Sequence, residues 1–117
     1  MGWHPDDPDF AADSAVKDWR TWMTKYLPDA DPHRPNYVNG YNYAATMVQV
    51  LKQAGNDLSR ENIMRQALNL RDLELPMLLP GIKVSTSPTD YYPVQQLQLM
   101  RFNGKRWERF GDVLQDE

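Results

Sequence analysis

Residues 36–67 read N-Y-V-N-G-Y-N-Y-A-A-T-M-V-Q-V-L-K-Q-A-G-N-D-L-S-R-E-N-I-M-R-Q-A, and this stretch decides the fold. It predicts two helices joined by a tight connection. In the first, expected over 38–54, Ala44, Val48 and Leu51 follow the i, i+4, i+7 spacing of one helix face. Further apolar residues widen that face: Ala45, Met47, Val50 and Ala54. Because a helix that is apolar nearly all round is normally buried on several sides, we expect this one to be central to the fold.

The connection between the two helices contains one residue typical of a helix end and one typical of a helix start. Gly55 is expected just beyond the end of the first helix, where a residue with positive φ commonly stands. Ser59 is the best N-cap for a second helix over 60–70, because its hydroxyl can accept a hydrogen bond from a free backbone N–H. The apolar face of that helix is expected to contain Ile63, Met64, Ala67 and Leu68.

An earlier helix is expected over 11–27. Its apolar positions recur at steps of three and four residues: Ala12, Val16, Trp19, Met23 and Tyr26. Asp9 or Asp13 could cap it, and Pro28 ends it. An aromatic stripe at this spacing is usually core, so we expect it to pack against the central helix.

The last third of the chain is predicted to be extended. Residues 82–85 alternate and predict a short strand. Residues 94–102 and 105–113 predict two more strands around Asn103-Gly104, a pair typical of a two-residue type I′ hairpin turn.

That turn fixes a register with one conflict. It places Met100 opposite Trp107, but it also places Arg101 opposite Arg106, and like charges facing each other across a hairpin are unfavourable. The register therefore requires one arginine to bend away or to pair with Glu108.

Taken together, the elements predict an α/β chain with three helices, a short strand and a C-terminal β-hairpin. A complete α/β domain would alternate helices and strands. A two-stranded hairpin is marginally stable alone, so we interpret the chain as the end of a larger fold.

Composition limits the function classes. The 117 residues carry a net charge of −3, which argues against a nucleic-acid partner, and they include no cysteine for thiol chemistry. No apolar run approaches the roughly 20 residues that span a bilayer. Met1-Gly2 precedes a segment rich in proline and aspartate, and we take it as the start of a piece of a longer protein.

The sequence contains none of the common catalytic, phosphate-binding or metal-binding motifs. We therefore expect no enzyme, no cofactor and no metal site. Tyr37, Tyr41 and Tyr43 gather at the start of the central helix, where free backbone N–H groups often bind ligands. Core packing with satisfied hydroxyls is the simpler interpretation and is favoured from the residues alone.

The order of three segments resembles a known family: the helix–Gly–helix unit at 37–67, P-M-L-L-P-G-I at 76–82 and L-M-R-F-N-G-K-R-W at 99–107. Together they resemble the C-terminal third of the solute-binding proteins of branched-chain amino acid ABC transporters, the type I periplasmic binding proteins. The resemblance extends over about residues 10–113.

This resemblance implies a two-lobed periplasmic protein, made with a signal peptide, that captures a small amino acid or amide-like solute. It would deliver the solute to ABC permease subunits in the inner membrane. Residues 1–9 would be a linker or start, 10–92 part of the first lobe, and 93–117 a hairpin of the second lobe. Residues just before the family's central helix line the cleft, and these correspond by position to Tyr37, Val38, Asn39 and Tyr41.

Two further expectations follow. Helices without their sheet would expose apolar side chains, including Trp19, Met23, Val48 and Leu51, so a homodimer or higher oligomer is expected. The alternative function is a stand-alone helical interaction module, in which the first helix presents Trp19 and Trp22 to a protein partner.

Overall fold

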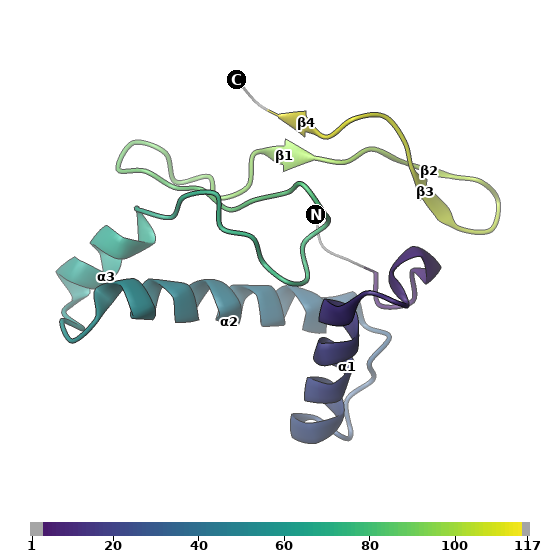
Figure 1. Cartoon of the computed structure of the whole chain (residues 1–117), viewed down its shortest axis with the longest axis horizontal. Coiled ribbons are helices and arrows are strands. Elements are labelled where there is room, and N and C mark those ends of the chain that lie inside the picture. The colour runs from purple at the N-terminus through teal and green to yellow at the C-terminus, as the bar shows by residue number, and fades with distance from the viewer. Residues whose placement is uncertain (1–3, 116–117) are drawn as a thin grey trace.

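A computed structural model describes residues 4–115 and places three helices before two small antiparallel sheets (Figure 1). This confirms the predicted order of elements. The expected linker at 1–9 and the expected hairpin segment at 93–117 extend beyond the described residues, at 1–3 and 116–117. The elements are a 3-10 turn η1 (Pro8–Phe10), helices α1 (Ser14–Tyr26), α2 (Pro35–Ala54) and α3 (Arg60–Ala67), and strands β1 (Gln96–Leu97), β2 (Met100–Phe102), β3 (Trp107–Arg109) and β4 (Leu114–Gln115).

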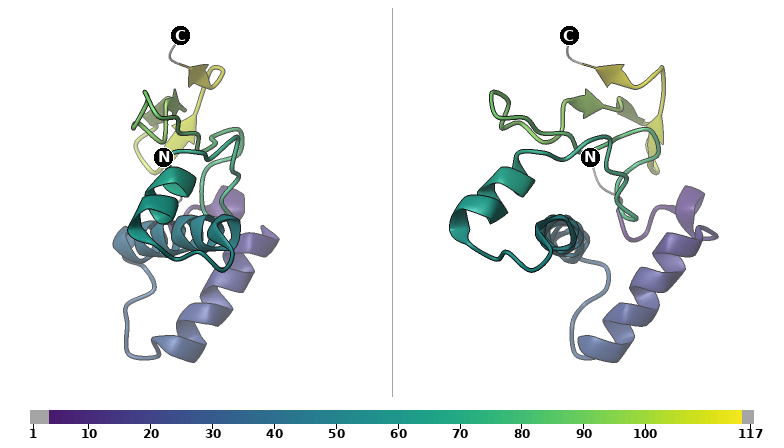
Figure 2. Two further views of the ribbon diagram at one scale, coloured as in Figure 1. Left: turned by 90° about the vertical axis from the view of Figure 1, so that its left-hand side faces the viewer. Right: turned by 60° about the vertical axis from the view of Figure 1, so that its left-hand side comes forward.

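Helix α2 lies between α1 on one side and the loops and strands of the later chain on the other (Figures 1 and 2). The described part of the molecule is flat, with extents of 49 × 40 × 19 Å. Its radius of gyration is 16.0 Å, against about 13 Å for a compact domain of this length. The helices are therefore covered on fewer sides than in a closed domain.

Helix α1 has its predicted N-cap and the central part of its predicted face, but Ala12 lies before the helix and Tyr26 is exposed. The carboxylate of Asp13 accepts from the backbone N–H groups of Ala15 and Val16, so the helix begins three residues later than predicted, after η1. Its buried face is Val16, Trp19 and Met23. Trp19 has no exposed surface, so the expectation that α1 presents it to a partner is wrong. Trp19 and Met23 are also absent from the exposed apolar surface where we expected them, because both pack in the core.

The connection from α2 to α3 confirms both predicted signals. Gly55 has a φ of 61°, and the Ser59 hydroxyl accepts from the backbone N–H of Asn62 at 3.3 Å. The helix bounds differ at two ends. Pro35 begins α2 three residues before the predicted start, since proline is suited to the first helical turn. Helix α3 ends at Ala67 rather than at residue 70.

The predicted buried face of α2 is wrong. Ala44, Val48 and Leu51 are exposed, with Val48 at 49% and Leu51 at 42% of their full accessible surface. Of the residues predicted to widen that face, Val50 and Ala54 are buried, and the other buried residues of α2 are Val38 and Asn42. These buried residues lie on one stripe, at steps of four or eight residues, and this stripe faces the segment 70–84.

An irregular segment supplies much of the core. Leu70, Met77, Leu78, Leu79, Ile82 and Val84 are all buried against residues of α1 and α2. The strand predicted at 82–85 is reduced to a single bridge, in which Leu73 and Val84 exchange two backbone hydrogen bonds of 2.9 Å. Pro76, Pro80 and Gly81 break the pairing on either side of the buried residues.

The hairpin exists, but its predicted register is wrong. Phe102 pairs with Trp107 and Arg101 pairs with Glu108, so the turn has four residues rather than two. The side-chain Oδ1 of Asn103 accepts from the backbone N–H groups of Lys105 and Arg106, both at 2.9 Å, and these bonds hold the wider turn. The observed register replaces an Arg–Arg pair with an Arg–Glu pair, which removes the predicted charge conflict.

The hairpin tip lies against the N-terminal segment. Arg106 Nη1 is 2.8 Å from Asp9 Oδ1, and the Arg109 guanidinium lies 4.6 Å from the centre of the Phe10 ring. The carboxylate of Asp9 raises the pKa of the Arg106 guanidinium. Residues near the two ends of the described chain therefore contact each other directly.

Candidate functional site

The four residues predicted to bind a ligand lie in the first two turns of α2, but they do not share one surface. Val38 has no exposed surface and is part of the core. Tyr37 and Tyr41 are half-buried and pack against that core. The Tyr41 ring lies edge-on to Trp22 of α1, with centroids 5.2 Å apart. Asn39 is exposed, and of the four it alone lines the cavity described next.

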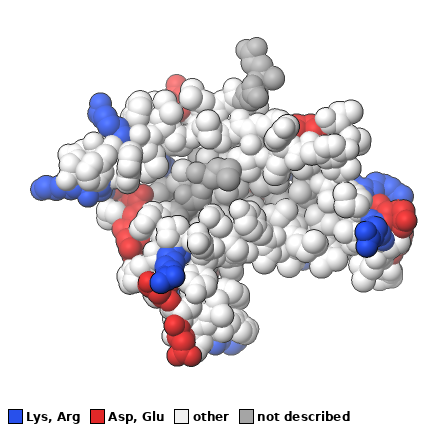
Figure 3. Space-filling model, turned by 180° about the vertical axis from the view of Figure 1, so that it is seen from behind, with Lys and Arg blue, Asp and Glu red and all other residues white. Residues whose placement is uncertain are grey.

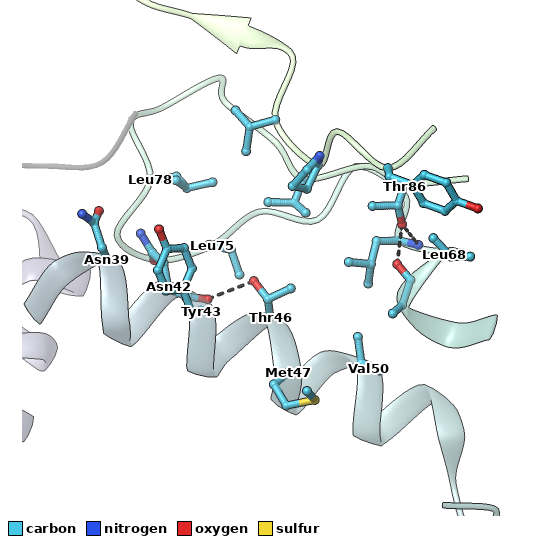
Figure 4. Close-up of a pocket in the computed structure, with 16 residues that line it drawn as sticks. Asn39, Asn42, Tyr43, Thr46, Met47, Val50, Leu68, Leu75, Leu78 and Thr86 are labelled. Carbon is cyan, nitrogen blue, oxygen red and sulfur yellow. Dashed lines mark hydrogen bonds between the residues drawn. The ribbon is translucent and has the colours of Figure 1, made fainter. Parts of the chain in front are cut away.

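This cavity has a volume of about 410 Å³ and lies between α2, the end of α3 and residues 68–94 (Figure 4). Most of its wall is aliphatic: Val50, Leu70, Leu75, Leu78, Val84 and Val94. Its polar lining residues are asparagine, threonine and tyrosine, and no lining residue is charged. A site with this lining suits a neutral molecule with an apolar body.

Two polar side chains hold the walls together. Asn42 Oδ1 accepts from the backbone N–H of Met77 at 3.3 Å, which joins α2 to the irregular segment. On the opposite wall, the Thr86 hydroxyl donates to Ala67 O at 2.7 Å and accepts from the Leu70 N–H at 3.1 Å. These bonds fix the distance between the helices and residues 70–86, so the cavity is part of the folded framework.

Asn42 was missed by sequence reasoning. It stands four residues after Val38 and eight before Val50, so it lies on the apolar stripe of α2. A polar residue on a buried stripe normally has a hydrogen-bonding role, because burial of an unpaired polar group is unfavourable. This spacing was available in the sequence, but the broad apolar surface of α2 hid which stripe is buried.

Two other cavities flank the fold. One of about 440 Å³ lies between the N-terminal segment and the hairpin, and its lining includes His4, Asp6 and Trp107. The other, of about 420 Å³, lies beside the exposed side of α2 and is lined in part by Tyr41 and Val48. Neither contains a buried polar side chain of the kind that Asn42 provides.

Asp6 and His33 connect the N-terminal segment to the loop before α2. Asp6 Oδ1 lies 2.5 Å from His33 Nδ1, and the hydrogen bond from His33 lowers the pKa of the Asp6 carboxyl below 3.8. A carboxylate with a lowered folded-state pKa stabilises the fold above its unfolded-state pKa, and this stabilisation is lost as pH falls through the folded-state value.

We therefore expect the stability advantage of the wild type over Asp6→Asn to be largest near neutral pH and to shrink on acidification. Urea unfolding from about pH 6 down to about pH 2 measures this difference directly. Asp29→Asn, a change at an exposed carboxylate in the same loop, is the control. A constant difference between wild type and Asp6→Asn across this range would contradict the role given to the Asp6–His33 pair.

The described residues form neither a metal-binding cluster nor a membrane-spanning helix. Within residues 4–115, no group of three or more His, Cys, Asp or Glu side chains is placed to hold a metal ion. None of the helices described is both long and apolar enough to cross a bilayer.

No protein-family model, curated protein or solved structure matches the chain.

Proposed function

We propose that the chain is the C-terminal part of a periplasmic solute-binding protein of an ABC transporter, of the branched-chain amino acid type. The complete protein would capture a small amino acid or amide-like solute and deliver it to permease subunits in the inner membrane. Residues 10–92 would belong to the first lobe and 93–117 to the second. The segment order noted in the sequence supports this assignment.

The observation that carries the proposal is the uncovered outer flank of α2. Met47, Val48 and Leu51 are all about half exposed along one side of the helix. Residues 4–115 form only two-stranded pairs, so they contain no broad sheet for this flank to cover. Seen from behind, the Lys, Arg, Asp and Glu side chains lie mainly toward the edges of the molecule (Figure 3). Exposed apolar side chains grouped as on this flank of α2 mark places where further protein packs.

The proposal is tested by the coding sequence upstream of Trp3. It should continue in frame for roughly 200 residues, the size of the missing parts of two ordinary domains, and should open with a signal peptide. The complete protein, produced from that frame, should bind leucine, isoleucine, valine or a related solute in calorimetry. A stop codon directly upstream would contradict the proposal.

Asn39 is the predicted ligand residue with the clearest test in the complete protein. Asn39→Ala should weaken solute binding by about 1–2 kcal/mol through a lost hydrogen bond, with little change in the unfolding midpoint because Asn39 is exposed. Met77→Ala, a change at a fully buried residue, should instead lower stability by about 2–5 kcal/mol. Unchanged affinity in Asn39→Ala would remove this residue from the proposed cleft.

Self-association of the 117-residue chain belongs to the same proposal. The outer flank of α2 and the short edges of β1–β4 could each pair with a second copy. Sedimentation at micromolar concentration should show a dimer or larger species. Replacing Val48 and Leu51 together by lysine should shift the chain toward monomer if the flank is the contact, and an unchanged mass would assign the contact elsewhere.

A further inference from the structure

The strongest unassigned feature is the side-chain nitrogen of Asn42. The side chain is 4% exposed, and its other polar atom faces the backbone N–H of Met77. Because a backbone N–H can only donate, the atom facing Met77 must be Oδ1. The amide group therefore directs Nδ2 away from Met77, and no acceptor for it is found among residues 4–115. Nδ2 is not one of the fully buried unpaired atoms of these residues, so it keeps some accessible surface, and because Asn42 lines the 410 Å³ cavity a molecule bound there can accept a hydrogen bond from it (Figure 4).

Two neighbours place further polar groups at the same end of the cavity. Asn39 and Tyr43 both line it from α2, and Figure 4 shows their side chains beside that of Asn42, with Leu75 and Leu78 across from them. Both residues are exposed, so they stand at the mouth. The cavity thus has a polar end that offers an amide donor, an amide carbonyl and a phenol, and an aliphatic interior.

We propose that this cavity, here named the α2 amide pocket, binds a neutral carboxamide that has an aliphatic or aromatic body. The carboxamide oxygen accepts from Asn42 Nδ2, and its NH₂ group donates to the Asn39 carbonyl or the Tyr43 hydroxyl. The apolar body lies against Leu75, Leu78 and Val50. Asn39 is also a residue of the proposed solute cleft, but the pocket can be tested without the rest of the transport protein, because every residue it uses lies within this chain.

Charge selects the carboxamide over a carboxylate. No Lys, Arg or His lines the pocket, so a carboxylate would lose its hydration without gaining a cation. A carboxamide of the same length carries no charge and can use both the donor and the acceptors at the polar end. The volume lies in the range of about 300–1,000 Å³ that is usual for small-molecule sites.

The test is an NMR titration of the ¹⁵N-labelled 117-residue chain with hexanamide, and with hexanoate at neutral pH as the matched charged probe. Hexanamide should shift the side-chain NH₂ resonances of Asn42 and the backbone N–H of Met77, with a Kd on the order of 1 mM. Hexanoate should bind at least about tenfold more weakly. The proposal would be overturned if the Asn42 NH₂ resonances did not shift at a hexanamide concentration of about ten times that Kd. Equal binding of hexanamide and hexanoate would overturn it as well.

One variant tests the Asn42 Nδ2 donor, and a second tests whether the ligand occupies the cavity volume. Asn42→Asp keeps an oxygen for the Met77 N–H but removes the Nδ2 donor, and it should weaken hexanamide binding by about tenfold. Thr46→Leu fills the pocket from the same helix and should abolish binding even if the first variant folds poorly. Val48→Leu, on the exposed outer flank of α2, is the matched control and should bind as the wild type does. Unchanged hexanamide affinity in Thr46→Leu would show that the molecule binds elsewhere and would overturn the assignment.

Discussion

Replacing Trp19 by alanine is expected to lower the free energy of unfolding by about 3–5 kcal/mol. The side chain is fully buried and is among the largest in the core, where it packs with residues of α1 and of the irregular segment. Small domains are stable by only about 5–15 kcal/mol, so this loss should move the urea midpoint by a large fraction of its value.

Two further variants show whether volume or the indole N–H matters at this position. The Nε1 of Trp19 is buried and has no hydrogen-bond partner within residues 4–115, so Trp19→Phe removes no hydrogen bond there and should cost much less than Trp19→Ala. Trp22→Ala, at a half-buried residue on the same helix, is the control and should also cost less. Equal losses in Trp19→Ala and Trp22→Ala would mean that the core is not centred on Trp19.

Asn62→Ala is expected to lower the free energy of unfolding by about 2–3 kcal/mol. Its Nδ2 donates to Ala54 O at 3.2 Å and to Asp57 O at 2.8 Å, so one buried amide binds the end of α2 and the turn into α3. Alanine at this position would leave both carbonyls without this donor. Thermal unfolding followed by circular dichroism measures the loss.

Asn56→Ala is the matched control for this change. Asn56 is an exposed asparagine in the same connection, and surface substitutions of this kind usually change stability by less than about 0.5 kcal/mol. If the two asparagine variants were equally stable, the hydrogen bonds of Asn62 would not explain how α3 packs on α2.

The helices could be predicted from sequence because their stop and start residues act locally. The side chains of Asp13 and Ser59 accept hydrogen bonds from backbone N–H groups in the first turns of α1 and α3, and Gly55 directly follows the end of α2. All three act on residues nearby in the sequence, so no knowledge of the tertiary fold is needed. The buried face of α2 is a different matter. Apolar residues surround this helix, and periodicity cannot decide which of several apolar stripes faces the core when the partner is an irregular segment at 70–84.

The hairpin shows how a local rule can be outweighed. Asn-Gly favours a two-residue turn, yet the side chain of Asn103 supports a four-residue turn by accepting from two backbone N–H groups. The wider turn moves Glu108 opposite Arg101. The charge conflict seen in the sequence was therefore a sign against the two-residue turn, which the Asn-Gly preference predicted wrongly.

Of the four residues predicted to bind a ligand, the structure places one beside the cavity and the other three in or against the core. Asn39 lies at the mouth of the α2 amide pocket, while Val38 and the tyrosine rings at 37 and 41 contribute to packing. Asn42 could not be singled out, because its role depends on the Met77 backbone N–H, 35 residues further along the chain.

The contact between the hairpin tip and η1 has a consequence for the order of folding. Asp9 and Arg106 are 97 positions apart, so bringing them together closes a loop of nearly the whole described chain. Such closure costs chain entropy, and an ion pair between exposed groups gives little in return. We therefore expect the helices and the core around Trp19 to form before the hairpin docks on η1. Salt screens the Asp9–Arg106 attraction, so we also expect this contact between the two ends to weaken first as ionic strength rises, while the helices stay folded.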